Sequence, residues 1–337
     1  MEAIILYLLF LANYSIPHNT IMSRFHDAKF FDFFLRPFII KVSEGLSMIF
    51  FIISILLYLL QNVSNKKFCT CVGSSSTGTA LIQNGICCLC ASVVLVIYGG
   101  FHILSPGALC LAILFGISYL GTVFLLLLAF STGTVGLSTL LCNIGMFIAA
   151  FYGMIRFGDA LTVFIAAGYV CMLAAVILTT PRKKEDERGG VRWFLFALGS
   201  GLCNGFVASV KREAVGILPE GIPSFLAIGF LFASLFALTF AFAVPKHRER
   251  ASHVIKRPRI LLFGALAGVG TAGANLFQMQ ALTALPSTVV YPLTSGTLVV
   301  SLWLASLWIY RETTAKPRNI ISVILCVLAI ILANIKL

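Results

Sequence analysis

The stretch that decides the fold is Ala281–Thr313, which reads ALTALPSTVVYPLTSGTLVVSLWLASLWIYRET. No charged residue lies between Pro286 and Arg311. A helix of that length is long enough to cross a hydrocarbon layer of about 30 Å, so the stretch is predicted to span a membrane. Pro292 lies deep inside it, and a proline removes one backbone donor from a helix. We therefore expect a locally irregular turn at that depth.

The composition of the whole chain agrees with this prediction. Of 337 residues, 59% are hydrophobic and 11% are charged, and the mean hydropathy is +1.01, far from the values of soluble domains. The net charge is +12, but the basic residues cluster in short connectors between apolar runs, which indicates topology rather than a nucleic-acid partner. The sequence predicts a multi-pass protein of the cell membrane, with the lipid bilayer around it and no nucleic-acid partner.

The ten cysteines do not indicate a metal site. Most lie within apolar runs, where cysteine behaves as a small hydrophobic residue. The two clusters, Cys69–Cys71 and Cys87–Cys90, have no histidine or carboxylate near them in sequence that would complete a zinc site. We therefore predict no metal and no cofactor.

Apolar runs recur along the chain at the length of membrane spans. They cover about 46–62, 80–99, 107–130, 133–155, 160–180, 193–210, 222–244, 260–282, 286–310 and 319–335. The predicted fold is all-α, with ten transmembrane helices. Five helices lie in residues 48–180 and five in residues 193–337, and a charged linker, residues 181–192, separates the two sets.

The two sets of five spans are related in sequence. The stretch Ala129–Asp159 echoes Ala281–Thr313, since both contain a long uncharged run that closes with an aromatic residue, an arginine and an acid. Gly145 falls opposite Gly296 when the two are aligned. Because each unit has an odd number of spans, the second must enter the membrane from the opposite side. The chain is therefore predicted to contain two inverted five-helix repeats, as many secondary transporters do.

Residues 1–47 do not follow this pattern. Met1–Ala12 is too short to span comfortably, and Lys29–Val42 is aromatic, basic and interrupted by Pro37. The segment has two interpretations: an anchor lying in the membrane interface, or translated upstream sequence with the true start at Met48. Nothing in the sequence separates them.

The five-plus-five pattern, the run ALTALPSTVVYPLTSGTLVV and the aromatic-Arg-Glu close before a final apolar helix resemble the EamA-type branch of the drug/metabolite transporter superfamily. The resemblance covers about Met48 to Leu337. It implies a carrier that alternates access to a central cavity between its two repeats. It also implies cytoplasmic termini, whereas the connectors carry sixteen basic residues on one side and four on the other, which places both ends of the ten-span unit outside. Orientation stays open.

Uncharged polar side chains inside the predicted spans are the candidates for a substrate site, because an unsatisfied amide in hydrocarbon costs several kcal/mol. They occur three or four residues apart, on shared helix faces, in four of the spans. The predicted substrate-binding residues are Asn143, Asn204, Asn275, Gln278, Tyr291, Thr294 and Ser295. The alternative is that these groups only hold the bundle together by interhelical hydrogen bonds.

Pro292 is predicted to be a hinge, since the helical bond it removes frees the carbonyl of Thr288. A plain kink is the alternative. The matching span of the first half has no proline and offers Asn143 instead. We expect the site to be asymmetric, with its irregular backbone in the second half.

No aspartate or glutamate lies deep within a predicted span. Drug–proton exchange of the small multidrug resistance type depends on a buried carboxylate, so that mechanism is disfavoured. Lys211 and Arg212 close the sixth predicted span. They could attract an anionic substrate, but side chains at a span end more often extend toward the membrane surface.

The sequence thus predicts a secondary transporter for a small polar or zwitterionic metabolite, or a drug-like compound, as its small-molecule substrate. No arrangement of nucleophile and base points to an enzyme. The main alternative is a non-transporting membrane scaffold or sensor, and an exporter of lipophilic cations is less favoured. A homodimer is left open.

Overall fold

The computed structural model of this chain is helical throughout the parts that it describes, which contain no strand. These parts are residues 29–72, 77–133, 135–143, 145–159, 162–179, 190–218, 221–245, 247, 254, 256–308 and 317–333.

The chain divides into two units, Met1–Leu46 and Ser47–Leu337. The predictions for residues 1–28 fall outside the described residues. From Lys29 the backbone is helical, as the beginning of α3 (Lys29–Val72). Everything that follows concerns the unit Ser47–Leu337.

Six of the described helices are long and apolar enough to cross a membrane. They are α3 from Ile49 to Val72, α4 (Thr77–Gly99), α5 (Pro106–Thr132), α9 (Val191–Ile217), α10 (Ile222–Ala243) and α12 (Pro258–Ala284). The chain therefore has the architecture of a multi-pass helical membrane protein. The remaining helices with apolar runs are shorter or rest partly on residues outside the description: α6 (Val135–Cys142), α7 (Gly145–Phe157), α8 (Val163–Thr179), α13 (Ser287–Trp308) and α14 (Pro317–Ala333).

Prolines mark several of the helix starts. Pro106 opens α5, where the Ser105 hydroxyl caps the helix by accepting from the Ala108 N–H, and Pro258 opens α12. A proline at the first helical position loses no hydrogen bond, and its fixed φ suits the helix.

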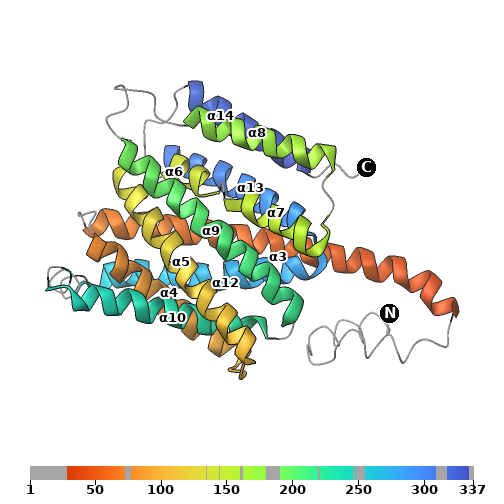
Figure 1. Ribbon diagram of the computed structural model, residues 1–337, viewed down its shortest axis with the longest axis horizontal. Helices are drawn as coiled ribbons and strands as arrows, with labels where there is room; N and C mark the ends of the chain where they lie inside the picture. The colour runs from red at the N-terminus through yellow and green to blue at the C-terminus, as the bar shows by residue number, and fades with distance from the viewer. Residues whose placement is uncertain are drawn as a thin grey trace. The chain divides into compact units, whose positions relative to one another are not determined.

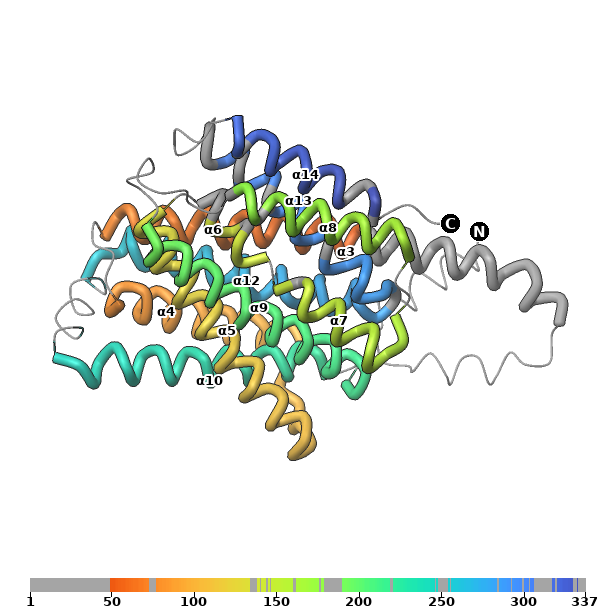
Figure 2. Tube along the Cα trace, turned by 45° about the horizontal axis from the view of Figure 1, so that its top comes forward, coloured from red at the N-terminus to blue at the C-terminus, as the bar shows by residue number. Residues whose placement is uncertain are grey.

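The helices pack in a defined set of pairs. Helix α4 lies against α10 and α12, α5 lies against α9 and α10, and α8 lies against α14 (Figure 1). Figure 2 shows α8 beside α14 and α4 beside α10 from a second direction. Helices α6 and α7 pack on α9 and α13. Helix α3 packs on α12, where Phe50 stacks on Phe277 and the Ser54 hydroxyl donates to Ala274 O at 2.9 Å.

Glycines let α7 and α9 approach closely. A Cβ added to Gly145 would overlap the carbonyl oxygen of Gly201 and the backbone nitrogen of Gly205. These are backbone atoms, which cannot move aside as a flexible side chain can. Small residues at helix interfaces are the general means of close packing in membranes, because lipid supplies no hydrophobic drive for association.

The interruption in the helices lies in the first half of the chain, contrary to the sequence expectation. Helix α6 ends at Cys142, Asn143 lies in a turn, and α7 begins at Gly145. In the second half, α13 runs from Ser287 to Trp308 without a break in its helical assignment, through Pro292. Asparagine competes for backbone groups with its side chain, here by donating to Thr139 O at 2.8 Å, and glycine weakens a helix further. A proline is tolerated in a membrane helix where neighbours accommodate it. Its hinge role stays a prediction.

Candidate functional site

A cavity of about 90 Å³, lined by both polar and apolar side chains, lies among α3, α5, α6, α9, α12 and α13. All seven of the predicted substrate-binding residues line it: Asn143, Asn204, Asn275, Gln278, Tyr291, Thr294 and Ser295. The structure thus brings together side chains that are up to 152 residues apart in the sequence, from both halves of the chain. Their role in binding a substrate stays a prediction.

One wall of this cavity was not predicted from the sequence. Tyr58, Gln61 and Asn62 of α3 and Tyr119 of α5 also line it. Their signal was present, because Tyr58, Gln61 and Asn62 have the i, i+3, i+4 spacing of a shared helix face. The first span was predicted to end near residue 62, however, whereas α3 continues to Val72. The three residues were therefore assigned to a span end rather than to its interior.

Lys211 is the charged group of the cavity, and its side chain is only 3% exposed. The interpretation that it extends toward the membrane surface from a span end is wrong, because α9 continues beyond it to Ile217. Its Nζ donates to Asn275 Oδ1 at 3.0 Å and to the Tyr58 hydroxyl at 3.3 Å, and it also donates to Gln278 Oε1.

Hydrogen bonds from the side-chain nitrogens of Asn275 and Gln278 fix the orientation of these two amides beside Lys211. Asn275 Nδ2 donates to Thr271 O at 2.8 Å, and Gln278 Nε2 donates to Thr294 Oγ1 at 3.4 Å. Both amides therefore turn their oxygens toward the lysine. The Tyr58 hydroxyl, which accepts from Lys211, lies within donating distance of Asn275 Oδ1 at 3.2 Å and of Gln278 Oε1 at 2.9 Å. Its single proton can bind one of these two oxygens at a time. The Lys211 amino group thus has hydrogen-bond partners, and the ones described are neutral.

A second chain of hydrogen bonds crosses the cavity wall. Gln61 Nε2 donates to the Tyr119 hydroxyl at 2.8 Å, and that hydroxyl donates to Thr271 Oγ1 at 3.3 Å. Gln61 Oε1 is buried and has no hydrogen-bond partner among the residues that the structure describes. A buried acceptor without a partner is costly, so this oxygen marks a place where a donor is missing.

Tyr291 lines the cavity and also joins two helices. Its hydroxyl donates to Ala208 O at 2.6 Å and so ties α13 to α9. The hydroxyl oxygen can still accept a hydrogen bond from a ligand, and the ring offers an apolar face.

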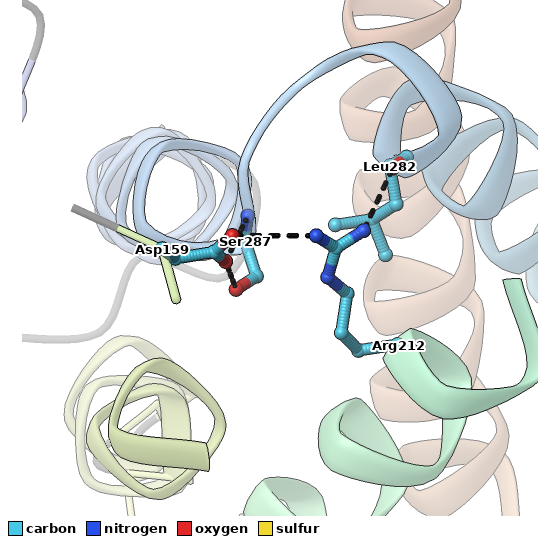
Figure 3. Close-up of polar contacts among 4 residues, drawn as sticks. All are labelled: Asp159, Arg212, Leu282 and Ser287. Atoms are coloured by element: carbon cyan, nitrogen blue, oxygen red, sulfur yellow. Dashed lines mark hydrogen bonds and ion pairs between the residues drawn. The ribbon is translucent and has the colours of Figure 1, made fainter. Parts of the chain in front are cut away.

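A cluster of charged and polar groups, the end cluster, joins α9 to the ends of α7, α12 and α13. Figure 3 shows Arg212 between Asp159 and Leu282, with Ser287 against the aspartate. Arg212 Nη2 lies 3.3 Å from Asp159 Oδ1, and its Nη1 donates to Leu282 O at 3.3 Å. Asp159 Oδ2 accepts from the Ser287 N–H at 3.1 Å and from the Ser287 hydroxyl. The arginine also lies over the ring of Phe157.

The end cluster lies one step beyond the cavity on each helix. Arg212 follows Lys211 directly in α9, and Ser287 precedes Tyr291 by one turn in α13. A second ion pair lies nearby, where Glu213 accepts from Arg156 at 3.2 Å and from the Tyr152 hydroxyl at 2.7 Å. Arg212 and Ser287 therefore lie within one turn of cavity residues along α9 and α13.

Among the side chains that the structure describes, no group of three or more histidines, cysteines, aspartates or glutamates could hold a metal ion. The sequence matches no family model and no curated protein. Among solved structures, 27 chains match the fold. One of them, described as "Crystal structure of protein", has a TM-score of 0.59 and 12% sequence identity, and the match covers 86% of this chain and 96% of that one. At this identity the likeness concerns the fold alone.

Proposed function

We propose that this chain is a secondary transporter that carries a small polar solute across the membrane by alternating access. The observation that carries the proposal is the polar cavity, which is lined by amides, hydroxyls and one lysine from helices of both halves. Buried polar groups within membrane helices are expensive, and they are characteristic of substrate pathways.

The proposal includes ten spans arranged as two inverted five-helix repeats. In such an arrangement each helix of the first half has a counterpart in the second, in the order α3, α4, α5, α6 with α7, and α8 against α9, α10, α12, α13 and α14. A contact between a helix of one half and a helix of the other should then recur between their two counterparts. Helix α5 packs on α9 and α10, and α12 correspondingly packs on α3 and α4. Helices α4 and α8 each pack on their own counterparts. This reciprocal pairing is what a twofold relation between repeats requires.

The sequence resemblance to EamA-type drug/metabolite transporters fits the same proposal. That resemblance runs over about Met48 to Leu337. The cavity would open alternately to the two sides of the membrane, with the end cluster of Asp159, Arg212 and Ser287 holding one side shut. At about 90 Å³ the cavity is much smaller than a typical drug site, which favours a compact solute.

Transport by the purified full-length protein in sealed liposomes tests the proposal. Liposomes are loaded with a panel of neutral, anionic and cationic metabolites, and the rate of efflux is compared with that of empty liposomes. At least one compound should leave faster. Efflux equal to that of protein-free liposomes for every compound would refute the transporter and favour a scaffold or sensor.

A pair of variants tests the site. Asn275→Ala removes an acceptor from the cavity, whereas Asn84→Ala removes a buried amide of α4 that donates to Leu120 O outside the cavity. Asn275→Ala should reduce efflux at least about tenfold, the loss expected when a hydrogen bond to a charged group is removed. Asn84→Ala should retain efflux in proportion to the amount of folded protein. Equal efflux by the two variants would remove the cavity from the proposal.

A further inference from the structure

We infer that the cavity binds a small carboxylate anion that carries a hydroxyl group, with Lys211 as the anion-binding side chain. The inference rests on the proposed transporter function and names the substrate class of its site. It follows from two features of the cavity that the protein itself leaves incomplete: the charge of Lys211 and the acceptor of Gln61.

Among the residues that the structure describes around the cavity, none is acidic, so a protonated Lys211 would have no counter-charge there. Asp159 and Glu213 are the only acids among the side chains that the structure describes, and they pair with Arg212 and Arg156. Burial of a charge is costly unless an opposite charge lies near it. An anionic ligand would supply that charge.

The neutral acceptors around Lys211 can be replaced by a ligand carboxylate. Its three acceptors are the oxygens of Asn275 and Gln278 and the hydroxyl of Tyr58, all of them uncharged. A carboxylate forms shorter and stronger hydrogen bonds to an ammonium than an amide oxygen does. A ligand carboxylate can therefore displace one of these acceptors and still leave the others to orient the lysine.

The unpartnered Gln61 Oε1 points to the second group of the ligand. Gln61 is 6% exposed, lines the cavity, and has its nitrogen engaged by Tyr119. Its free oxygen needs a donor. A hydroxyl supplies one without charge, whereas a ligand ammonium would share the small cavity with Lys211 and be repelled. The site is thus suited to a hydroxycarboxylate rather than to an amino acid, an amine or a lipophilic cation.

Four compounds of similar size separate these chemistries. Lactate has the carboxylate and the hydroxyl, propionate lacks the hydroxyl, lactamide lacks the charge, and alanine replaces the hydroxyl by an ammonium. The purified full-length protein is heated in a chloride-free buffer with each compound, since a ligand of the folded state raises the melting temperature. Lactate should raise it most, and lactamide and alanine should bind at least about tenfold more weakly. Propionate should fall between them.

Variants of Lys211 and Gln61 test which side chain binds the carboxylate of the ligand and which binds its hydroxyl. Lys211→Met keeps the aliphatic stem without the charge and should abolish the lactate effect. The matched control Lys66→Met removes a lysine that donates to Phe130 O outside the cavity, and it should leave the effect unchanged. Gln61→Leu should make lactate and propionate equivalent. If Lys211→Met does not fold, Lys211→Arg, which retains the charge, should keep the preference for lactate over lactamide.

The inference is overturned if lactamide, alanine or chloride stabilises the protein as well as lactate does, or if no compound has an effect. It is also overturned if Lys211→Met responds like Lys66→Met. Its failure is separate from that of the transporter proposal. Liposome efflux of neutral solutes without lactate binding would refute the substrate class alone, and lactate binding without any efflux would refute transport alone.

Discussion

Lys211 and Arg212 are consecutive residues of α9, yet they lie in opposite electrostatic surroundings. Arg212 pairs with Asp159 at 3.3 Å and belongs to the end cluster. Among the described residues, Lys211 contacts only neutral oxygens in the cavity. Successive side chains of a helix point about 100° apart, so one helix can serve both regions. A buried cation needs both hydrogen bonds and a counter-charge. Among the described residues, both side chains have hydrogen bonds, but Arg212 alone of the two has a counter-charge.

The largest effect should come from giving the cavity the counter-charge that it lacks. Gln278→Glu places a carboxylate where Lys211 already donates to Gln278 Oε1. The new pair should neutralise the lysine and compete with an anionic ligand. Binding of lactate, measured by its shift of the melting temperature, should weaken about tenfold to hundredfold.

The neutral variant Gln278→Met controls for loss of the amide itself. It should bind lactate better than Gln278→Glu does. Lactate binding by Gln278→Glu that equals the unmodified protein would mean that the cavity charge does not hold the ligand.

Removing the counter-charge from the end cluster should have a smaller effect on lactate binding and a clear effect on the stability of the protein. Asp159→Asn leaves Arg212 without its acid, at side chains that are 8% and 17% exposed respectively. The loss of a largely buried charged partner should lower the free energy of unfolding by about 1–3 kcal/mol. The melting temperature should fall by a few degrees, while the lactate shift persists.

Arg212→Gln completes a double-mutant cycle with Asp159→Asn. The two changes together should cost less than the sum of the single changes, because the pair is lost only once. Strict additivity would show that the two side chains do not interact in the folded protein.

The smallest effect is expected at the outer ion pair. The Arg156 side chain is 61% exposed, so its bond to Glu213 is screened by water and salt. Arg156→Gln should lower the free energy of unfolding by less than Asp159→Asn does, and the difference should shrink at high salt. Thermal melts at low and high ionic strength measure it. A loss as large as that of Asp159→Asn would contradict the ranking by burial.

The contrast between the two regions also explains what the sequence could predict. The cavity amides and hydroxyls stand out because each interrupts an apolar run, and all seven predicted residues line one cavity. Lys211 and the α3 wall were placed at span ends, because an apolar run stops at its first polar cluster while the helix continues. Helices α9 and α3 extend to Ile217 and Val72. The polar ends of those helices are the parts that belong to the site.

The backbone interruption could not be predicted from local preference alone. Proline is the strongest helix breaker in the sequence, yet α13 is helical through Pro292. The break occurs instead beside Asn143, where Gly145 meets Gly201 and Gly205 of α9. That close approach is a tertiary contact, and the sequence shows neither its partner nor its tightness.

The central claim is that Lys211 holds a carboxylate substrate in a cavity that opens to both sides of the membrane. Counterflow in liposomes tests it most directly: vesicles loaded with unlabelled lactate are diluted into labelled lactate, and the label inside is followed. The unmodified protein and Lys66→Met should accumulate label transiently above its equilibrium level, and Lys211→Met should not. Accumulation by Lys211→Met equal to that of Lys66→Met, or none by the unmodified protein, would contradict the claim.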